Sequence, residues 1–332
     1  MGGSTDLVAV DVGGTHARFA IAHIASDGSL TLDDPVTIHT SDHASFQTAW
    51  EDFRARRGGT LPTRMAMAVA AAIKPDIIRF TNNPWIIRPP LIEQKLGITQ
   101  HIVINDFAAV AHAAARADAE QFLPLAGPQS DLPAGGTISV LGPGTGLGVA
   151  HFHRDPSGQY RVQATEGGHG DFAPLDAIED NVLARLRQRH NRVSNERVVS
   201  GPAIVDIYQA LAAMEGRAVV ERSDVEIWTA GMAEEDSLAA AAVDRFCLAL
   251  GSVAGDIALV QGASGVVIAG GLGYRLRDIL PASGFADRFC AKGRFAGLMA
   301  SIPVKLITHP QPGLLGAAAA FAQTYLEPRP SP

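Results

Sequence analysis

Residues 7–24 read LVAVDVGGTHARFAIAHI, two apolar β-rich runs joined by the turn Gly13-Gly14-Thr15. Far downstream, residues 137–152 read TISVLGPGTGLGVAHF, where the turn Gly142–Gly146 joins two similar runs. Apolar runs joined by a glycine turn predict β-hairpins. Each turn leaves backbone N–H groups open and adds a threonine hydroxyl, which suits the phosphates of a nucleotide. The repeat therefore predicts a duplicated fold and a nucleotide held between two similar halves.

The bulk composition is that of an ordinary soluble globular protein. The chain has 332 residues, of which 47% are hydrophobic and 18% charged, enough for two domains with well-developed cores. Its net charge is −7, so the protein has no overall positive electrostatic potential. We therefore expect neither nucleic acid nor an anionic membrane as a partner.

The cysteine content and the N-terminal residues indicate a cytoplasmic protein. The two cysteines, Cys247 and Cys290, are too few for a disulfide framework or a four-ligand zinc site, so we expect buried thiols in a reducing compartment. Asp6 and Asp11 interrupt the first apolar run, and no basic segment precedes it, which argues against a signal peptide. Two longer charge-free stretches are rich in glycine and are expected to be strands and turns, not membrane spans.

Strands alternate with helices in both halves, which predicts an α/β fold. The expected strands after the hairpins are 35–40, 64–73, 102–104, 160–164, 266–269 and 304–307. The expected helices are 46–56, 107–117, 176–189, 203–214, 236–260 and 313–326. We predict a small domain from residues 1–110 plus 312–332 and a large domain from residues 111–311, with a cleft between them.

Asp11 ends the first strand immediately before the glycine turn. A carboxylate at this point can hold Mg²⁺, directly or through water, beside bound phosphates. If the first loop is considered without the second, Asp11 is explained equally well as an aspartate that forms the turn. The second loop has Leu141 in the equivalent place, so we expect it to serve phosphate only. Thr15 and Thr145 would donate hydroxyls to phosphate, or otherwise cap their turns.

The second glycine loop matches neither common nucleotide-binding motif. A dinucleotide fingerprint starting at Gly142 or Gly144 would need a third glycine where Leu147 or Val149 stands. No Gly-Lys-Ser/Thr occurs anywhere in the chain, so the Walker pattern is also absent. Rossmann and P-loop folds are therefore excluded.

Asn105-Asp106 follows a buried strand, the place where α/β folds put ligand-binding groups. A partly desolvated carboxylate there could accept the proton of a substrate hydroxyl that attacks phosphorus. Alternatively, Asp106 is the N-cap of a helix that starts at Phe107.

Further candidates lie in Glu166-Gly167-Gly168-His169, where two glycines separate a carboxylate from an imidazole. This pattern predicts backbone open to a ligand and two side chains converging on hydroxyl groups. Glu196 by itself would be assigned to a solvated helix face, and Asn82-Asn83 to a loop.

Together these segments resemble the bacterial glucokinases of the hexokinase-like type, within the actin and sugar-kinase superfamily. The resemblance covers essentially the whole chain. It rests on 11–15 with 17–18, 81–85, 104–107, 142–148, 166–169 with 171–174, 196–202, 269–271 and 312–316.

The resemblance implies two actin-like, ribonuclease H-like α/β domains around an active-site cleft that closes on the sugar. It implies ATP-dependent phosphorylation of D-glucose to glucose 6-phosphate, with Asp106 as the general base on the 6-hydroxyl. The implied sugar ligands are Asn82, Asn105, Asp106, Glu166, His169 and Glu196. The implied ATP-binding residues are Asp11, Gly13, Gly14, Thr15, Gly144, Thr145, Gly146, Gly270 and Gly271. Asp11 would face Mg²⁺, and a homodimer is expected.

A related group of sugar kinases and repressors carries a zinc-binding cysteine cluster, which Cys247 and Cys290 cannot form, so no zinc is expected. The alternatives are a kinase for another hexose or an amino sugar, a different donor such as polyphosphate, or a sugar-sensing regulator without turnover. The retained Asp11 and Asp106 argue against the regulator.

Overall fold

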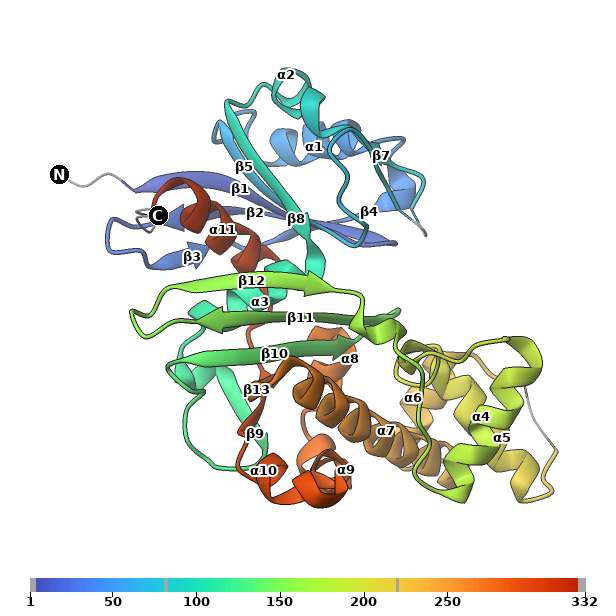
Figure 1. Cartoon of the computed structure of the whole chain (residues 1–332). Coiled ribbons are helices and arrows are strands. Elements are labelled where there is room, and N and C mark those ends of the chain that lie inside the picture. Colours follow the sequence, from blue (N-terminus) through green and yellow to red (C-terminus); the bar gives the residue numbers. More distant parts are fainter. Residues whose placement is uncertain (1–3, 81–82, 219–220, 328–332) are drawn as a thin grey trace. The chain divides into compact units, whose positions relative to one another are not determined.

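The computed structural model describes residues 4–80, 83–218 and 221–327, and it divides the chain into two compact units (Figure 1). The first unit runs to Ala117 and resumes at His309, and the second extends from Asp118 to Thr308. The sequence instead predicted divisions after residues 110 and 311. A division after residue 110 would cut through the helix α3 (Asp106–Arg116), which lies whole in the first unit.

The first unit is built on a sheet with the order β3-β2-β1-β5-β8, and β4 also pairs with β2. β1 and β2 form the predicted antiparallel hairpin, whereas β1, β5 and β8 run parallel. The strands are β1 (Thr5–Val12), β2 (His16–Ile24), β3 (Leu30–Leu32), β4 (Val36–His39), β5 (Arg64–Val69) and β8 (Gln100–Asn105). A separate two-stranded ribbon pairs β6 (Ile78–Arg79) with β7 (Ile86–Ile87).

Helices cover both faces of this sheet. Alternate residues of β1 point to opposite faces, and both sets are buried against helices. Val8 and Val10 belong to a core with Trp50 of α1 (Phe46–Arg56), which also includes residues of α2 (Ile92–Leu96). Leu7 and Ala9 pack instead with residues of α3 and of α11 (Pro312–Tyr325).

The backbones of α3 and α11 are in direct contact where the two helices cross. A Cβ atom added at Gly316 of α11 would lie 1.6 Å from the carbonyl oxygen of Ala109 in α3. Only a hydrogen atom fits at this crossing, so glycine is required there. Both helices begin close to this contact. α3 begins at Asp106, three residues before Ala109, and α11 begins at Pro312, four residues before Gly316.

The second unit repeats this strand order in β12-β11-β10-β13-β14, with β9 added at the edge beyond β14. β10–β11 and β11–β12 are antiparallel, and β10–β13 and β13–β14 are parallel, as in the first unit. The strands are β9 (Phe122–Ala126), β10 (Gly136–Pro143), β11 (Leu147–Arg154), β12 (Tyr160–Thr165), β13 (Ala263–Ile268) and β14 (Val304–Ile307). The predicted duplication is confirmed, whereas β9 was not predicted.

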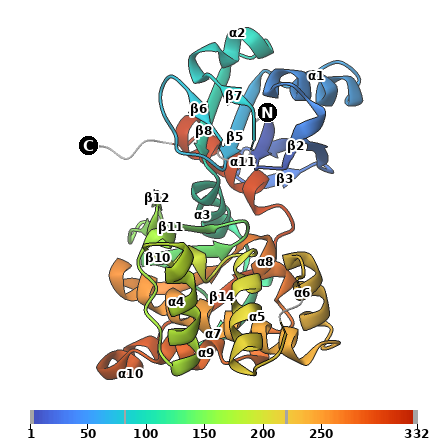
Figure 2. The same ribbon diagram turned by 90° about the vertical axis from the view of Figure 1, so that its right-hand side faces the viewer.

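In the second unit, α5, α6 and α9 pack against the long α7 (Ser237–Gln261), and α4 and α5 lie side by side (Figure 2). The shorter helices of this unit are α4 (Ala177–Arg189), α5 (Ala203–Met214), α6 (Asp224–Met232), α8 (Gly270–Arg275), α9 (Phe285–Cys290) and α10 (Ala296–Ala300). In the part of the chain that is described, α7 alone is long and apolar enough to cross a membrane. Of its apolar window, 72% is buried in the structure, as in a core helix.

The two cysteines differ in burial. Cys247 is buried in α7, and burial raises the pKa of its thiol to about 12. Cys290 is only partly buried, so the expectation of two buried thiols is right for Cys247 alone.

Gly316→Ala should strongly destabilise the protein, because the new methyl group would meet the Ala109 carbonyl at 1.6 Å and force the helices apart. Overpacking of this kind costs about 1–3 kcal/mol or more. The midpoint of urea unfolding measures the effect. Gly297→Ala is the control, because a Cβ there meets nothing within 4 Å and should leave stability unchanged or slightly higher. Equal midpoints for the two variants would contradict the contact.

His112 should make the protein sensitive to acid. Burial lowers its pKa from 6.5 to about 4, so the folded state keeps it neutral while the unfolded state takes up a proton. Stability should therefore fall by about 3 kcal/mol as the pH drops from 6.5 to about 4. In urea titrations across this range, His112→Gln should flatten the pH dependence, whereas the exposed His153→Gln should not.

Candidate active site

Strand register brings Asp11 and the Asn105-Asp106 pair to one edge of the first unit's sheet. Asp11 of β1 lies opposite Ala68 of β5, which lies opposite Ile104 of β8. Neighbouring strands are about 4.8 Å apart, so the ends of β1 and β8 are about 10 Å apart. The carboxyl ends of parallel strands thus carry both predicted carboxylates.

Asp11 sits in a partly desolvated corner, with 23% of its side chain exposed. Its carboxylate lies 3.6 Å from the guanidinium of Arg18, the residue directly across the hairpin. A Cβ at Gly313, in the first turn of α11, would come within 2.8 Å of Asp11 Oδ2. Burial raises the pKa of Asp11, and Arg18 opposes that rise.

These surroundings fit a hydrated Mg²⁺. A desolvated carboxylate gains most from a cation, and an oxygen ligand is the type that Mg²⁺ prefers. Arg18 was not among the predicted site residues, although the hairpin register, which pairs Asp11 with Arg18, could have identified it.

The first glycine turn is held by hydrogen bonds from outside it. Thr40 Oγ1 donates to the Gly14 carbonyl at 2.9 Å, and Asn83 Nδ2 donates to the Gly13 carbonyl at 3.2 Å. The Thr15 hydroxyl and His16 Nδ1 are 2.9 Å apart. Burial, then His39, then Arg18 lower the pKa of His16, which favours its neutral form. Side chains of two other segments therefore hold the carbonyl groups of both glycines in this turn.

Asn105, and not Asp106, is the N-cap of α3. The Asn105 Oδ1 accepts hydrogen bonds from the backbone N–H groups of Phe107 and Ala108 at 2.9 and 3.1 Å. Asp106 is the first helical residue, and its Oδ1 accepts from Phe107 N at 2.9 Å. The alternative that made Asp106 the N-cap is therefore wrong. Capping occupies the Asn105 oxygen, while the amide nitrogen of Asn105 is not part of the cap.

In the second unit, the glycine turn packs directly on the segment that contains Gly270. A Cβ at Gly142 would lie 2.2 Å from the Ala269 carbonyl, and one at Gly270 would lie 2.8 Å from the Pro143 carbonyl. Gly270 also has a φ of 83°, which favours glycine. By contrast, a Cβ at Gly144 or Gly271 meets nothing within 4 Å. In the second unit, the hairpin turn and the Gly270 segment are therefore in backbone contact, and Gly144 and Gly271 beside this contact have space for an added atom.

The second unit also groups Glu166, His169 and Glu196 around this turn. Glu196 Oε2 accepts a hydrogen bond from Leu147 N at 2.9 Å, and a Cβ at Gly146 would lie 2.3 Å from the same oxygen. Glu166 Oε2 and His169 Nε2 are 3.8 Å apart, and both side chains are exposed. A Cβ at Gly168 would meet the Leu147 carbonyl at 2.2 Å, so this segment packs on the same turn.

Glu196 does not lie on a solvated helix face, because it belongs to a short 3₁₀ turn at Asn195–Arg197 and is half-buried. Asn82 lies outside the described residues. Among residues 4–80, 83–218 and 221–327, no group of three or more histidine, cysteine, aspartate or glutamate residues could hold a metal ion. The predicted residues that are described thus form two groups, one within each unit.

The repeated sheet order, with a glycine turn in each hairpin, is typical of the phosphotransferases of the actin and sugar-kinase superfamily. The sequence profile described as Glucokinase matches residues 7–324 of the chain. The glucokinase of Zymomonas mobilis is 53% identical over 322 residues, covering 97% of this chain and 99% of that protein.

Two solved structures are similar to this chain over almost its whole length. A glucokinase from an Antarctic psychrotroph has a TM-score of 0.83 and 34% identity, covering 96% of this chain and 99% of that chain. A glucokinase of the ROK family from Streptomyces griseus, solved in complex with glucose and AMPPNP, has a TM-score of 0.60 and 18% identity, with coverage of 97% and 100%, and shares the fold. The chain belongs to the glucokinase family and is an enzyme.

Gly142→Ala and Gly144→Ala should separate structural from ligand-facing glycines in one turn. Gly142→Ala should lower the melting temperature by the equivalent of about 1–3 kcal/mol, because its methyl group would clash with the Ala269 backbone. Gly144→Ala should leave melting unchanged but reduce the stabilisation by MgATP, because its methyl group would enter the open space. Thermal melts with and without MgATP measure both effects. Unaltered MgATP stabilisation in Gly144→Ala would contradict a phosphate over this turn.

Proposed function

We propose that the chain transfers the γ-phosphoryl group of ATP to the 6-hydroxyl of D-glucose. The observation that carries the proposal is that Asp11 lies near the end of β1 and Asp106 follows β8 at the carboxyl end of the same sheet, where two strand spacings, about 10 Å, separate β1 from β8. That separation leaves room for a phosphoryl group between a metal-facing carboxylate and a base. Membership of the glucokinase family supports glucose as the acceptor.

Asp106 would act as the general base. Its Oδ1 already accepts the Phe107 N–H in the first turn of α3, and the positive end of the helix favours the ionised carboxylate. The carboxylate can accept the proton of the sugar hydroxyl as that hydroxyl attacks phosphorus. Asn105 would hold the segment through its cap and offer its amide N–H₂ to a sugar oxygen.

The two glycine turns would bind the phosphates of ATP. Gly13, Gly14 and Thr15 form the first turn, and Gly144–Gly146 the second. The N–H of Gly13 donates to the His16 carbonyl and that of Gly144 to the Gly146 carbonyl, which shapes the two turns. The N–H groups of Gly14, Thr15, Thr145 and Gly146 and the two threonine hydroxyls would then bind phosphate oxygens. The neighbouring Gly270-Gly271 leaves room for the adenosine. Asp11 would hold Mg²⁺ through water, with Arg18 beside it. When bound, this ion neutralises charge on the phosphate oxygens.

Glu166, His169 and Glu196 would hydrogen-bond the remaining sugar hydroxyls, together with Asn82 and Asn105. A site that pairs each hydroxyl rejects epimers that leave a buried polar group unpaired. These residues come from both units, so we propose that sugar binding closes a cleft between them. Closure would exclude water, which competes with the sugar for the phosphoryl group.

The family resemblance further supports a cytoplasmic homodimer that supplies glucose 6-phosphate to glycolysis. No zinc enters this proposal, since Asp11 alone is assigned to a metal.

Asp106→Asn should reduce turnover by about 10²–10⁴-fold, because the amide cannot accept the proton of the attacking hydroxyl. ADP release should be measured with MgATP and D-glucose, beside mannose, fructose and N-acetylglucosamine. Glucose binding should persist in the variant, since the amide keeps the size of the carboxylate.

Asp34→Asn is the matched control, since Asp34 is exposed and its backbone carbonyl, not its side chain, accepts a bond from Arg57. Its turnover should equal that of the unaltered enzyme. Near-full turnover in Asp106→Asn would exclude Asp106 as the base. Glucose binding without ADP release in the unaltered enzyme would point to another phosphoryl donor.

A further inference from the structure

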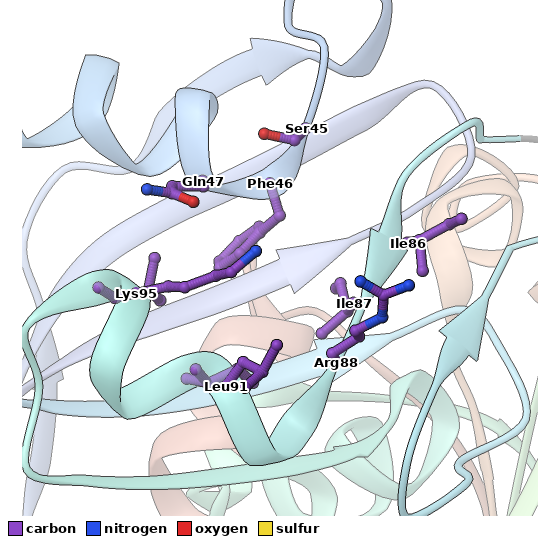
Figure 3. Close-up of a pocket in the computed structure, with 10 residues that line it drawn as sticks. Ser45, Phe46, Gln47, Ile86, Ile87, Arg88, Leu91 and Lys95 are labelled. Atoms are coloured by element: carbon purple, nitrogen blue, oxygen red, sulfur yellow. The ribbon is translucent and has the colours of Figure 1, made fainter.

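A pocket of about 170 Å³ lies in the first unit on the opposite face of the sheet from Asp11 (Figure 3). Its lining residues come from the start of α1, from β7 and the segment after it, and from α2. They are Ser45, Phe46, Gln47, Ile86, Ile87, Arg88, Leu91, Ile92, Lys95 and Leu96. None of these residues is assigned to the proposed active site.

The floor of the pocket is apolar and its rim is cationic. Phe46, Ile87 and Leu96 are buried core residues that form part of the floor. Arg88 and Lys95 stand on opposite sides of the pocket (Figure 3). Among the described residues that line it, none is acidic. The pocket therefore offers positive charge above a hydrophobic surface.

The acidic residues of α1 and α2 pair with other groups, and Glu51 of α1 pairs with Arg54 at 3.1 Å. Glu93, on the same helix as Lys95, pairs with His101 at 3.1 Å. Asp52 of α1 pairs with Arg56 at 2.8 Å and with His43 at 3.2 Å. Within residues 4–80, 83–218 and 221–327, neither Arg88 nor Lys95 takes part in an ion pair.

We propose that this pocket is an effector site for a small organic carboxylate with a short apolar chain. The carboxylate would lie between Arg88 and Lys95, since guanidinium and ammonium groups both donate to carboxylate oxygens. The chain would cover Phe46 and Ile87. At about 30 Å³ for each water-sized group, the volume suits roughly five or six such groups. An inorganic anion alone would leave the apolar floor uncovered.

The pocket connects to the first glycine turn through Trp85. The Phe46 ring lies 6.1 Å from the Trp85 ring, and Trp85 directly precedes β7. Trp85 N donates to Asn83 Oδ1 at 2.9 Å, and Asn83 Nδ2 donates to the Gly13 carbonyl at 3.2 Å. A ligand on Phe46 and Ile87 would therefore bias the position of the phosphate-binding turn. This consequence rests on the proposed function.

Binding can be tested without catalysis, by thermal shift and ligand-observed NMR with acetate, butyrate, hexanoate, butanol and inorganic phosphate. We expect saturable binding of butyrate, weaker binding of acetate and phosphate, and none of butanol. Arg88→Ala and Lys95→Ala should each weaken butyrate binding at least several-fold. Arg79→Ala should not, since Arg79 lies on the same ribbon but does not line the pocket.

The absence of saturable butyrate binding, or equal binding by all three variants, would overturn the site. In kinetic assays, saturating butyrate should change the KM for ATP several-fold, and the change should vanish in Arg88→Ala. Binding that leaves this KM unaltered would overturn the effector role. An enzyme without glucose-dependent turnover that still binds butyrate would overturn the proposed function and leave the site standing.

Discussion

The backbone contact between α3 and α11 fixes the geometry on which the candidate site depends. Because Gly316 has no side chain, α11 lies directly on the Ala109 carbonyl and both helices begin at the same end of the sheet. That arrangement puts Gly313 against Asp11 and Asp106 in the first turn of α3. The positive ends of two helix dipoles then lie near two carboxylates at the strand ends. A wider crossing would separate these groups.

In the second unit, a similarly close backbone contact between glycines holds two loops together. The Gly142–Gly270 contact joins the hairpin turn to the start of α8, and Glu196 is tied to the same hairpin through Leu147 N. Residues assigned to nucleotide and to sugar therefore share one piece of backbone. A shift of that turn would be transmitted to Glu196 through its hydrogen bond with Leu147 N and its close approach to Gly146.

Sequence patterns predicted best what local contacts determine. Both hairpins, the parallel strands and most helices follow from runs of apolar residues and from glycine turns. Asn105-Asp106 shows the limit of such patterns, because either residue can cap a helix and only the backbone geometry selects Asn105. Glu196 and β9 required contacts between residues far apart in sequence, which periodicity does not encode. The pocket between α1, β7 and α2 arises in the same way from three separate segments.

The position of α11 in the chain has a consequence for biosynthesis. Its residues complete the apolar face that Leu7 and Ala9 present, yet they leave the ribosome after the whole second unit has been made. The second unit can therefore fold while the first still exposes one side of its sheet. During that interval the exposed strand face is a surface for chaperones or for aggregation, and the docking of α11 ends the interval.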